Sequence, residues 1–299
     1  MPEKVNGLRT LASTVVALVA FAANSVLCRL ALGEAAIDAA SFSTIRLASG
    51  ASMLWLTSTA LAGNAPRKQY GDWTSASLLF LYAVPFSYAY VTLSTGTGAL
   101  ILFGSVQAAM ILNALLSGEG PLVSEWLGLF AAVMGLVYLL FPGLSAPPFV
   151  GSALMAVAGI SWGLYSLRGR RSEDPVRVTT GNFVRSVPFV AVLSLVMWRS
   201  SSVSGKGAIL ALLSGALTSG GGYVVWYQAL RGLTATRAAI VQLSVPVLAA
   251  IGGVVFLSET ITPRLLVSTF IILGGVCLAI VSRQRQGVLK SVTTRTAAK

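Results

Sequence analysis

The sequence contains no histidine and few acidic residues, with nine Asp and Glu among 299 residues. Without histidine, and with Cys28 and Cys277 far apart in sequence, the chain has no cluster typical of a zinc or haem site. Both cysteines lie in apolar stretches, so we interpret them as small buried hydrophobic residues. We therefore expect no metal, no cofactor and no catalytic residues.

Charged residues are also scarce. They make up 10% of the chain, whereas 55% of the residues are hydrophobic and the mean hydropathy is +0.81. A soluble domain carries about 25% charged residues, so this composition predicts an all-α integral membrane protein. The net charge of +12 comes from basic residues at the ends of apolar runs. That distribution indicates orientation in a lipid bilayer, and we expect no nucleic acid partner.

Apolar windows separated by turn residues predict ten transmembrane helices of roughly 20 residues each. The expected spans are 10–31, 39–62, 73–93, 97–117, 122–141, 148–167, 178–198, 207–230, 235–257 and 263–282. Lys4 and Arg9 precede an apolar run, as in a signal peptide. We nevertheless expect the first span to be retained, because it belongs to an internal repeat.

The distribution of Lys and Arg predicts the orientation. With a cytoplasmic N-terminus, 15 of these residues lie in cytoplasmic segments, and three, Arg199, Lys206 and Arg264, lie outside. Because positive charge accumulates on the cytoplasmic side, we expect a multi-pass protein of the inner cell membrane with both termini in the cytoplasm. The basic tail 286–299, rich in Ser and Thr, is expected to be disordered.

The two halves of the chain align at an offset of 139 to 140 residues. Arg46 matches Arg185, Glu119 matches Glu259, and Gly135 matches Gly275. Since each half has five spans, an odd number, the second copy enters the membrane in the opposite sense. Inverted repeats are typical of secondary transporters, whose substrate site lies near the midplane. We expect a first repeat at 1–146 and a second at 147–285.

The same residues carry a family resemblance. Arg46 and Arg185, the span ends Leu116–Glu119 and Leu257–Glu259, Pro246, Gly135 and Gly275 are similar to motifs of the drug/metabolite transporter superfamily, in its EamA-type branch. The resemblance covers residues 10–282 and implies ten helices in two inverted five-helix repeats. Trp162 and the aromatic-rich inner spans most resemble the family's exporters of aromatic amino acids. Pro246 departs from the repeat, because Val106 occupies the matching position.

Ionisable residues inside a membrane are candidates for ion coupling or substrate binding. All the acidic residues lie in loops or at span ends, which leaves no carboxylate near the midplane as a proton carrier. Glu119 and Glu259 either interact with the N-terminus of the helix that follows each of them or form a gate. Arg46 and Arg185 lie about two turns inside their spans. They either bond to a neighbouring carbonyl or contact a substrate carboxylate.

Neutral polar and aromatic residues at mid-span are the main candidates for a substrate site. An uncompensated amide in hydrocarbon costs several kcal/mol, so such residues face other helices or a wet cavity. Aromatic side chains at this depth form either an apolar pocket or ordinary helix packing. The expected substrate-binding residues are Asn24, Tyr82, Phe86, Phe103, Trp162, Tyr223, Trp226, Gln242 and Ser244.

Together these features predict a secondary transporter, not an enzyme, that exports aromatic or other apolar amino acids and related metabolites by alternating access. Uncoupled facilitated diffusion is one mode open to it. A multidrug exporter, or an exporter of other metabolites, that carries planar or cationic compounds stays an alternative, since aromatic pockets also accept planar cations. A membrane-embedded lipid enzyme would need paired carboxylates, a histidine cluster or a metal site. The expected partners are a small-molecule substrate and the lipid bilayer. A monomer would suffice for this function.

Overall fold

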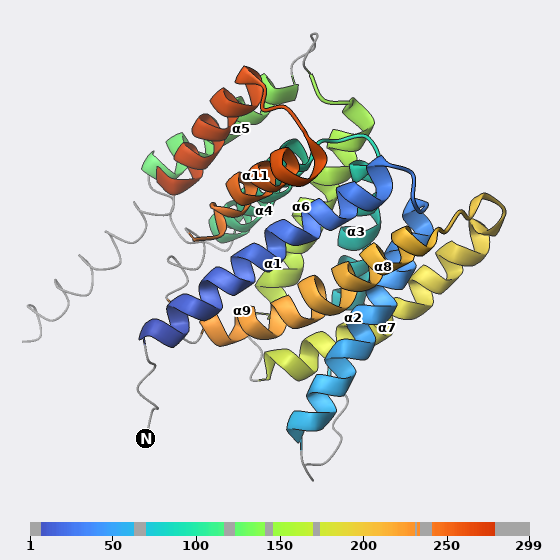
Figure 1. Cartoon of the computed structure of the whole chain (residues 1–299). Coiled ribbons are helices and arrows are strands. Elements are labelled where there is room, and N and C mark those ends of the chain that lie inside the picture. Colours follow the sequence, from blue (N-terminus) through green and yellow to red (C-terminus); the bar gives the residue numbers. More distant parts are fainter. Residues whose placement is uncertain are drawn as a thin grey trace, which may run out of the picture.

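The computed structural model describes residues 7–62, 70–116, 123–140, 146–169, 174–230, 232–233 and 241–278. Helices dominate these segments (Figure 1). They are α1 (Gly7–Gly33), α2 (Ala39–Ala62), α3 (Trp73–Tyr90), α4 (Thr95–Leu116), α5 (Val123–Leu140), α6 (Phe149–Gly169), α7 (Pro175–Val196), the short 3₁₀ turn η1 (Trp198–Ser200), α8 (Gly205–Leu213), the π-helical segment η2 (Ser214–Gly221), α9 (Gly222–Leu230) and α11 (Val245–Leu257). A further apolar helix spans Pro263–Leu278. The expected tail 286–299 lies outside the described residues.

Helices occupy most of nine expected spans, within a few residues at each end. Four helices in the described segments are long and apolar enough to cross a membrane by themselves: Gly7–Gly33, Phe149–Gly169, Val176–Val196 and Gly205–Ala229. Large apolar side chains such as Phe130, Phe149 and Leu195 are exposed. Exposed apolar side chains of this size suit contact with lipid tails.

The ninth span differs from the expected uninterrupted helix. Within the described part of this span, residues 241–242 are helical, 243–244 form a turn, and α11 begins at Val245. Pro246 therefore stands in the first turn of α11, where its missing N–H costs no hydrogen bond. The expectation that Pro246 lies inside a continuous helix is wrong. The proline starts a helix after a break.

The helices pack in pairs that join distant parts of the chain. In Figure 1, α1 lies alongside α9, and α3 and α6 are neighbours. Other contacts join α1 to α11, α4 to α6 and to α11, and α2 to α7 and to η2. The helix Pro263–Leu278 lies against α5. There a Cβ on Gly135 would lie 2.8 Å from Ile272, and one on Gly275 would lie 2.6 Å from the Gly128 carbonyl oxygen. These two glycines allow the close approach of the two helices.

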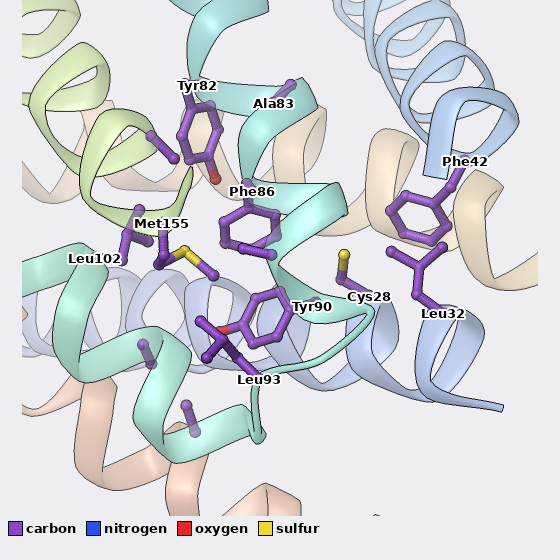
Figure 2. Packing of buried hydrophobic residues seen from close by; sticks show 14 of the residues in the cluster. Cys28, Leu32, Phe42, Tyr82, Ala83, Phe86, Tyr90, Leu93, Leu102 and Met155 are labelled. Carbon is purple, nitrogen blue, oxygen red and sulfur yellow. The ribbon is translucent and has the colours of Figure 1, made fainter. Parts of the chain in front are cut away.

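The core follows one face of α3. Figure 2 shows Tyr82, Phe86 and Tyr90 along this helix, with Met155 of α6 facing Phe86. Phe86 and Tyr90 are fully buried, and their ring centroids are 4.8 Å apart in an edge-to-face arrangement. The i, i+4 spacing of these three residues places them on one stripe of the helix. The stripe connects the middle of the molecule to the end of α3.

Candidate functional site

A small cavity lies between α1, α3, α4, α6, η2 and α9. Its walls are Phe21, Asn24, Ser25, Tyr82, Phe86, Leu102, Phe103, Trp162, Thr218, Ser219 and Tyr223. Its volume is about 20 Å³, which is room for about one water molecule. A substrate the size of an amino acid enters only if the walls separate. The described conformation is therefore closed around this point.

Aromatic rings form one side of the cavity. Trp162 of α6 is stacked on Tyr223, with ring centroids 5.0 Å apart and planes inclined by 22°. The Trp162 ring centroid is also 4.9 Å from that of Tyr82. Phe21 and Phe86 extend this wall, with centroids 6.2 Å from Tyr223 and 5.4 Å from Tyr82 respectively. Offset and edge-to-face contacts of this kind favour a further planar ring.

Amide and hydroxyl groups form the other side. The Asn24 carbonyl oxygen Oδ1 accepts hydrogen bonds from Ser214 Oγ at 2.7 Å and from Thr218 Oγ1 at 3.2 Å. Its Nδ2 donates to the Tyr82 hydroxyl at 3.5 Å. Both hydroxyl donors to Oδ1 come from η2. Short π-helical stretches occur frequently at functional sites, and this one places Thr218 and Ser219 in the cavity wall and Ser214 against Asn24.

Arg46 of α2 lies directly behind the polar wall. Its side chain is 1% exposed. Nη2 donates to the Tyr82 hydroxyl at 2.9 Å, and Nε donates to Ser219 Oγ at 3.3 Å. The guanidinium carbon lies 5.1 Å from the ring centroid of Tyr82 and 4.8 Å from that of Phe86. The wall of the cavity is thus backed by a buried positive charge.

The cavity lies halfway along α3. Tyr82 stands nine residues after Trp73 and eight before Tyr90, the two ends of this helix. At a rise of about 1.5 Å per residue, its Cα is about 12–14 Å from either end. The hydrocarbon core of a bilayer is about 30 Å thick. In a bilayer-spanning arrangement of α3, the position of Tyr82 would be near the midplane.

A polar cluster closes the end of the bundle where α3 ends. Glu259 accepts hydrogen bonds from the backbone N–H of Thr95, with its two oxygens at 2.8 and 3.0 Å. Arg29 Nε pairs with Glu259 at 3.4 Å, and Nη1 donates to the carbonyls of Tyr90 and Val91 at 2.9 Å each. Glu259 therefore sits at a helix N-terminus, as one sequence hypothesis proposed. The helix is α4, however, and not the one that follows Glu259. We call these residues the α3-end cluster.

A second polar cluster lies where α3 begins. Asp72 caps α3 through the backbone N–H of Ser75 at 2.9 Å and pairs with Arg168 of α6 at 3.1 Å. Burial raises the pKa of Asp72. The hydrogen bonds from Ser75 and the charge of Arg168 outweigh that effect, so the pKa lies below its ordinary value. Arg185 Nη1 donates to the carbonyls of Tyr70 and Gly181 at 2.7 and 3.1 Å. This is the α3-start cluster.

The two arginines that match in the repeat thus have different surroundings. Arg185 bonds to backbone carbonyls near the end of the bundle, which is the structural role expected as one option. Arg46 has hydroxyl and aromatic partners near the cavity. Both arginines were expected about two turns inside their spans, so the sequence alone does not distinguish them. The tertiary packing does.

Six of the nine expected site residues line the cavity: Asn24, Tyr82, Phe86, Phe103, Trp162 and Tyr223. Trp226, Gln242 and Ser244 do not line it. Trp226 stands almost one turn beyond Tyr223 and packs edge-on against Phe21, with ring centroids 5.7 Å apart. Ser244 Oγ donates to the Val241 carbonyl at 2.6 Å in the break before α11. Gln242 is half-buried in the helical residues just before this break.

The sequence analysis did not select five wall residues: Phe21, Ser25, Leu102, Thr218 and Ser219. The glycine-rich run after Ser214 is the signal that could have found two of them. Small hydroxyl side chains beside glycines are common wherever helices pack closely in membranes. The sequence therefore gives no reason to select Thr218 and Ser219. In the structure, the π-helical segment places Thr218 beside Asn24 and Ser219 beside Arg46.

The chain is similar to known transporters. Residues 149–281 match the model of the EamA-like transporter family. An uncharacterised protein of Pseudomonas aeruginosa is 50% identical over 283 residues, covering 95% of this chain and 97% of that protein. The threonine/homoserine exporter RhtA of Escherichia coli is 33% identical over 159 residues, about half of each chain. One solved crystal structure has a TM-score of 0.64 over 90% of this chain and 98% of its own, at 18% identity. At that identity the likeness shows the fold alone.

Proposed function

The chain belongs to the EamA-like transporter family, a family of membrane transporters, and we propose that it exports aromatic or other apolar amino acids by alternating access. The observation that carries this proposal is the cavity halfway along α3, with an aromatic wall on one side and, on the other, a polar wall backed by the buried charge of Arg46. A zwitterion with a planar side chain matches both walls. The printed name of the relative RhtA, a threonine/homoserine exporter, supports amino acids as the substrate class.

The two polar clusters suit such a mechanism. One lies at each end of α3, with the cavity between them. In our proposal, an outward-facing state forms when the α3-end cluster separates. An inward-facing state forms when the α3-start cluster separates. Since the clusters share no residue, each can open while the other stays closed.

We further propose that the halves 1–146 and 147–285 are inverted repeats. The packing supports this arrangement. Exchanging each first-half helix with its second-half counterpart means exchanging α1 with α6, α2 with α7, α3 with α9 and α4 with α11. This exchange converts the contacting pair α1 and α9 into the contacting pair α6 and α3. It also converts α1 and α11 into α6 and α4. The pairs α2 with α7 and α4 with α11 convert into themselves. The family match at 149–281 falls within the second half.

In the proposed orientation both termini are cytoplasmic, in the inner membrane, so the α3-end cluster faces outward. All the carboxylates of the sequence lie in loops or at span ends. A proton-coupled exporter commonly carries its proton on an acidic side chain within the membrane. We therefore propose uncoupled movement down the substrate gradient, through a monomer.

Uptake of radiolabelled compounds into liposomes containing the purified protein tests the proposal. With no ion gradient imposed, phenylalanine and tryptophan should enter with saturable kinetics and should compete with each other. Threonine, homoserine and a planar quaternary cation form the comparison set. A protein that moved only the cation would be a drug exporter. The buried charge of Arg46 argues against that outcome, because like charges repel.

A further inference from the structure

Arg46 is the largest fully buried side chain in the described part of the chain. Two of its three guanidinium nitrogens have partners, the Tyr82 hydroxyl and Ser219 Oγ. The third nitrogen, Nη1, is buried without a hydrogen-bond partner among the described residues. An unsatisfied buried donor on a charged group is expensive, and such groups rarely stay unpaired without a functional reason.

The charge of Arg46 is also without a counter-ion in the described segments. The four ion pairs found there join Arg29 to Glu259, Arg168 to Asp72, Arg177 to Asp174 and Lys206 to Glu34. The faces of Tyr82 and Phe86 stabilise the guanidinium only in part, because the gain from a cation–π contact is small. A fully buried charge without an ionic partner costs more than that.

The position of Arg46 connects this unsatisfied charge to the cavity. Its contacts are Tyr82, Phe86 and Ser219, and all three also line the cavity. One layer of side chains therefore separates the guanidinium from the space where a substrate would lie.

We propose that Arg46 is the receptor for the carboxylate of the substrate. The inference rests on the proposed function and narrows it to compounds with a carboxylate beside an aromatic or apolar group. When the walls separate, the carboxylate accepts hydrogen bonds from Nη1 and from Nη2, which the Tyr82 hydroxyl releases. A guanidinium with two free N–H groups matches a carboxylate in this two-bond geometry. The substrate ring then faces Trp162 and Tyr223.

The test measures carboxylate selectivity, which a merely structural arginine would not control. Phenylalanine and phenylalaninol differ in that a CH₂OH group replaces the carboxylate. Binding of each to the purified, detergent-solubilised protein is measured by competition with radiolabelled phenylalanine and, for weak variants, by calorimetry. The wild-type protein should prefer phenylalanine by about 10- to 100-fold, the size expected for hydrogen bonds to a charged group.

Arg46→Gln should reduce this preference to less than about threefold. Arg185→Gln is the matched control, because Arg185 holds the same place in the repeat but bonds to backbone carbonyls. It should keep the wild-type preference even if its transport rate falls. An equal loss of affinity for both compounds in Arg46→Gln would overturn the inference and leave the proposed function intact. Failure of the wild-type protein to bind or transport any aromatic amino acid would instead overturn the proposed function.

Tyr82→Phe provides a second route if Arg46→Gln does not fold. This substitution removes one hydroxyl and frees Nη2 of its acceptor. Two guanidinium nitrogens then lack partners, so the preference for phenylalanine over phenylalaninol should rise. An unchanged or lower preference would show that the guanidinium does not meet the carboxylate.

Discussion

Glu259→Gln tests whether the α3-end cluster holds the outer side closed. The carboxylate binds the Thr95 N–H through both oxygens and pairs with Arg29, and these two side chains are 16% and 23% exposed. A hydrogen bond to a charged group contributes about 1.5–3 kcal/mol. Glutamine keeps one neutral acceptor but removes the ion pair. We therefore expect the closed state to lose about 2 kcal/mol relative to the open one, which is about a 30-fold change in their ratio.

A cysteine at Ser25 reports this change. Ser25 lines the cavity one turn before Arg29 on α1, so it lies between the cavity and the cluster. With Cys28 and Cys277 replaced by serine, Ser25→Cys should react slowly with a membrane-impermeant thiol reagent added outside. Adding Glu259→Gln should accelerate labelling by roughly 10- to 100-fold, in proportion to the open population.

Glu34→Gln is the matched control for that experiment. Glu34 pairs with Lys206 at the same end of the bundle, but both side chains are more than half exposed. Exposed pairs contribute little, about 0–1 kcal/mol, so labelling should change by less than about fivefold. If Glu259→Gln labels no faster than Glu34→Gln, the α3-end cluster is not the outer closure.

Three further predictions concern stability. Gly215→Ala should lower the melting temperature strongly or prevent folding, because a Cβ there would collide with the Arg46 carbonyl oxygen of α2. Gly274→Ala, whose Cβ meets nothing within 4 Å, should leave the melting temperature equal or raised. Asp72 has a lowered pKa, so the stability it contributes is present above about pH 3.9 and disappears as the pH falls through the lowered value. The melting temperature should therefore fall more steeply on acidification in the wild type than in Asp72→Asn; equal slopes would contradict this.

Hydropathy and turn residues alone predicted most of the helices. A transmembrane helix needs a long apolar run whatever its neighbours are, so its location is a local property. The π-helical segment η2 and the break before α11 were not predicted as such. The first depends on the packing of η2 against α2. The second depends on the position of Pro246 relative to the start of α11. Boundaries of that kind are set by tertiary contacts.

The candidate site was predictable to the extent that its residues are unusual at mid-span. Asn24, Tyr82 and Trp162 stand out because amides and aromatic side chains are conspicuous in an apolar run, and all three line the cavity. Trp226 was equally conspicuous, but it faces Phe21. Periodicity shows that two residues share a face of one helix. It does not show which neighbouring helix that face contacts. For the same reason, the different surroundings of Arg46 and Arg185 could not be predicted from the sequence.

The most direct test of the central claim, that the aromatic cavity is the transport site, is phenylalanine uptake by Trp162→Ala beside Trp126→Ala. Trp162 lines the cavity and contacts Tyr82, Tyr165 and Tyr223, whereas Trp126 on α5 is 52% exposed. In liposomes with equal amounts of folded protein, Trp162→Ala should lower the initial rate at least tenfold, since loss of a stacked ring removes about 1 kcal/mol or more beyond its buried area. Trp126→Ala should transport within about twofold of the wild type, since its side chain makes no part of the wall. Equal rates in the two variants would contradict the account.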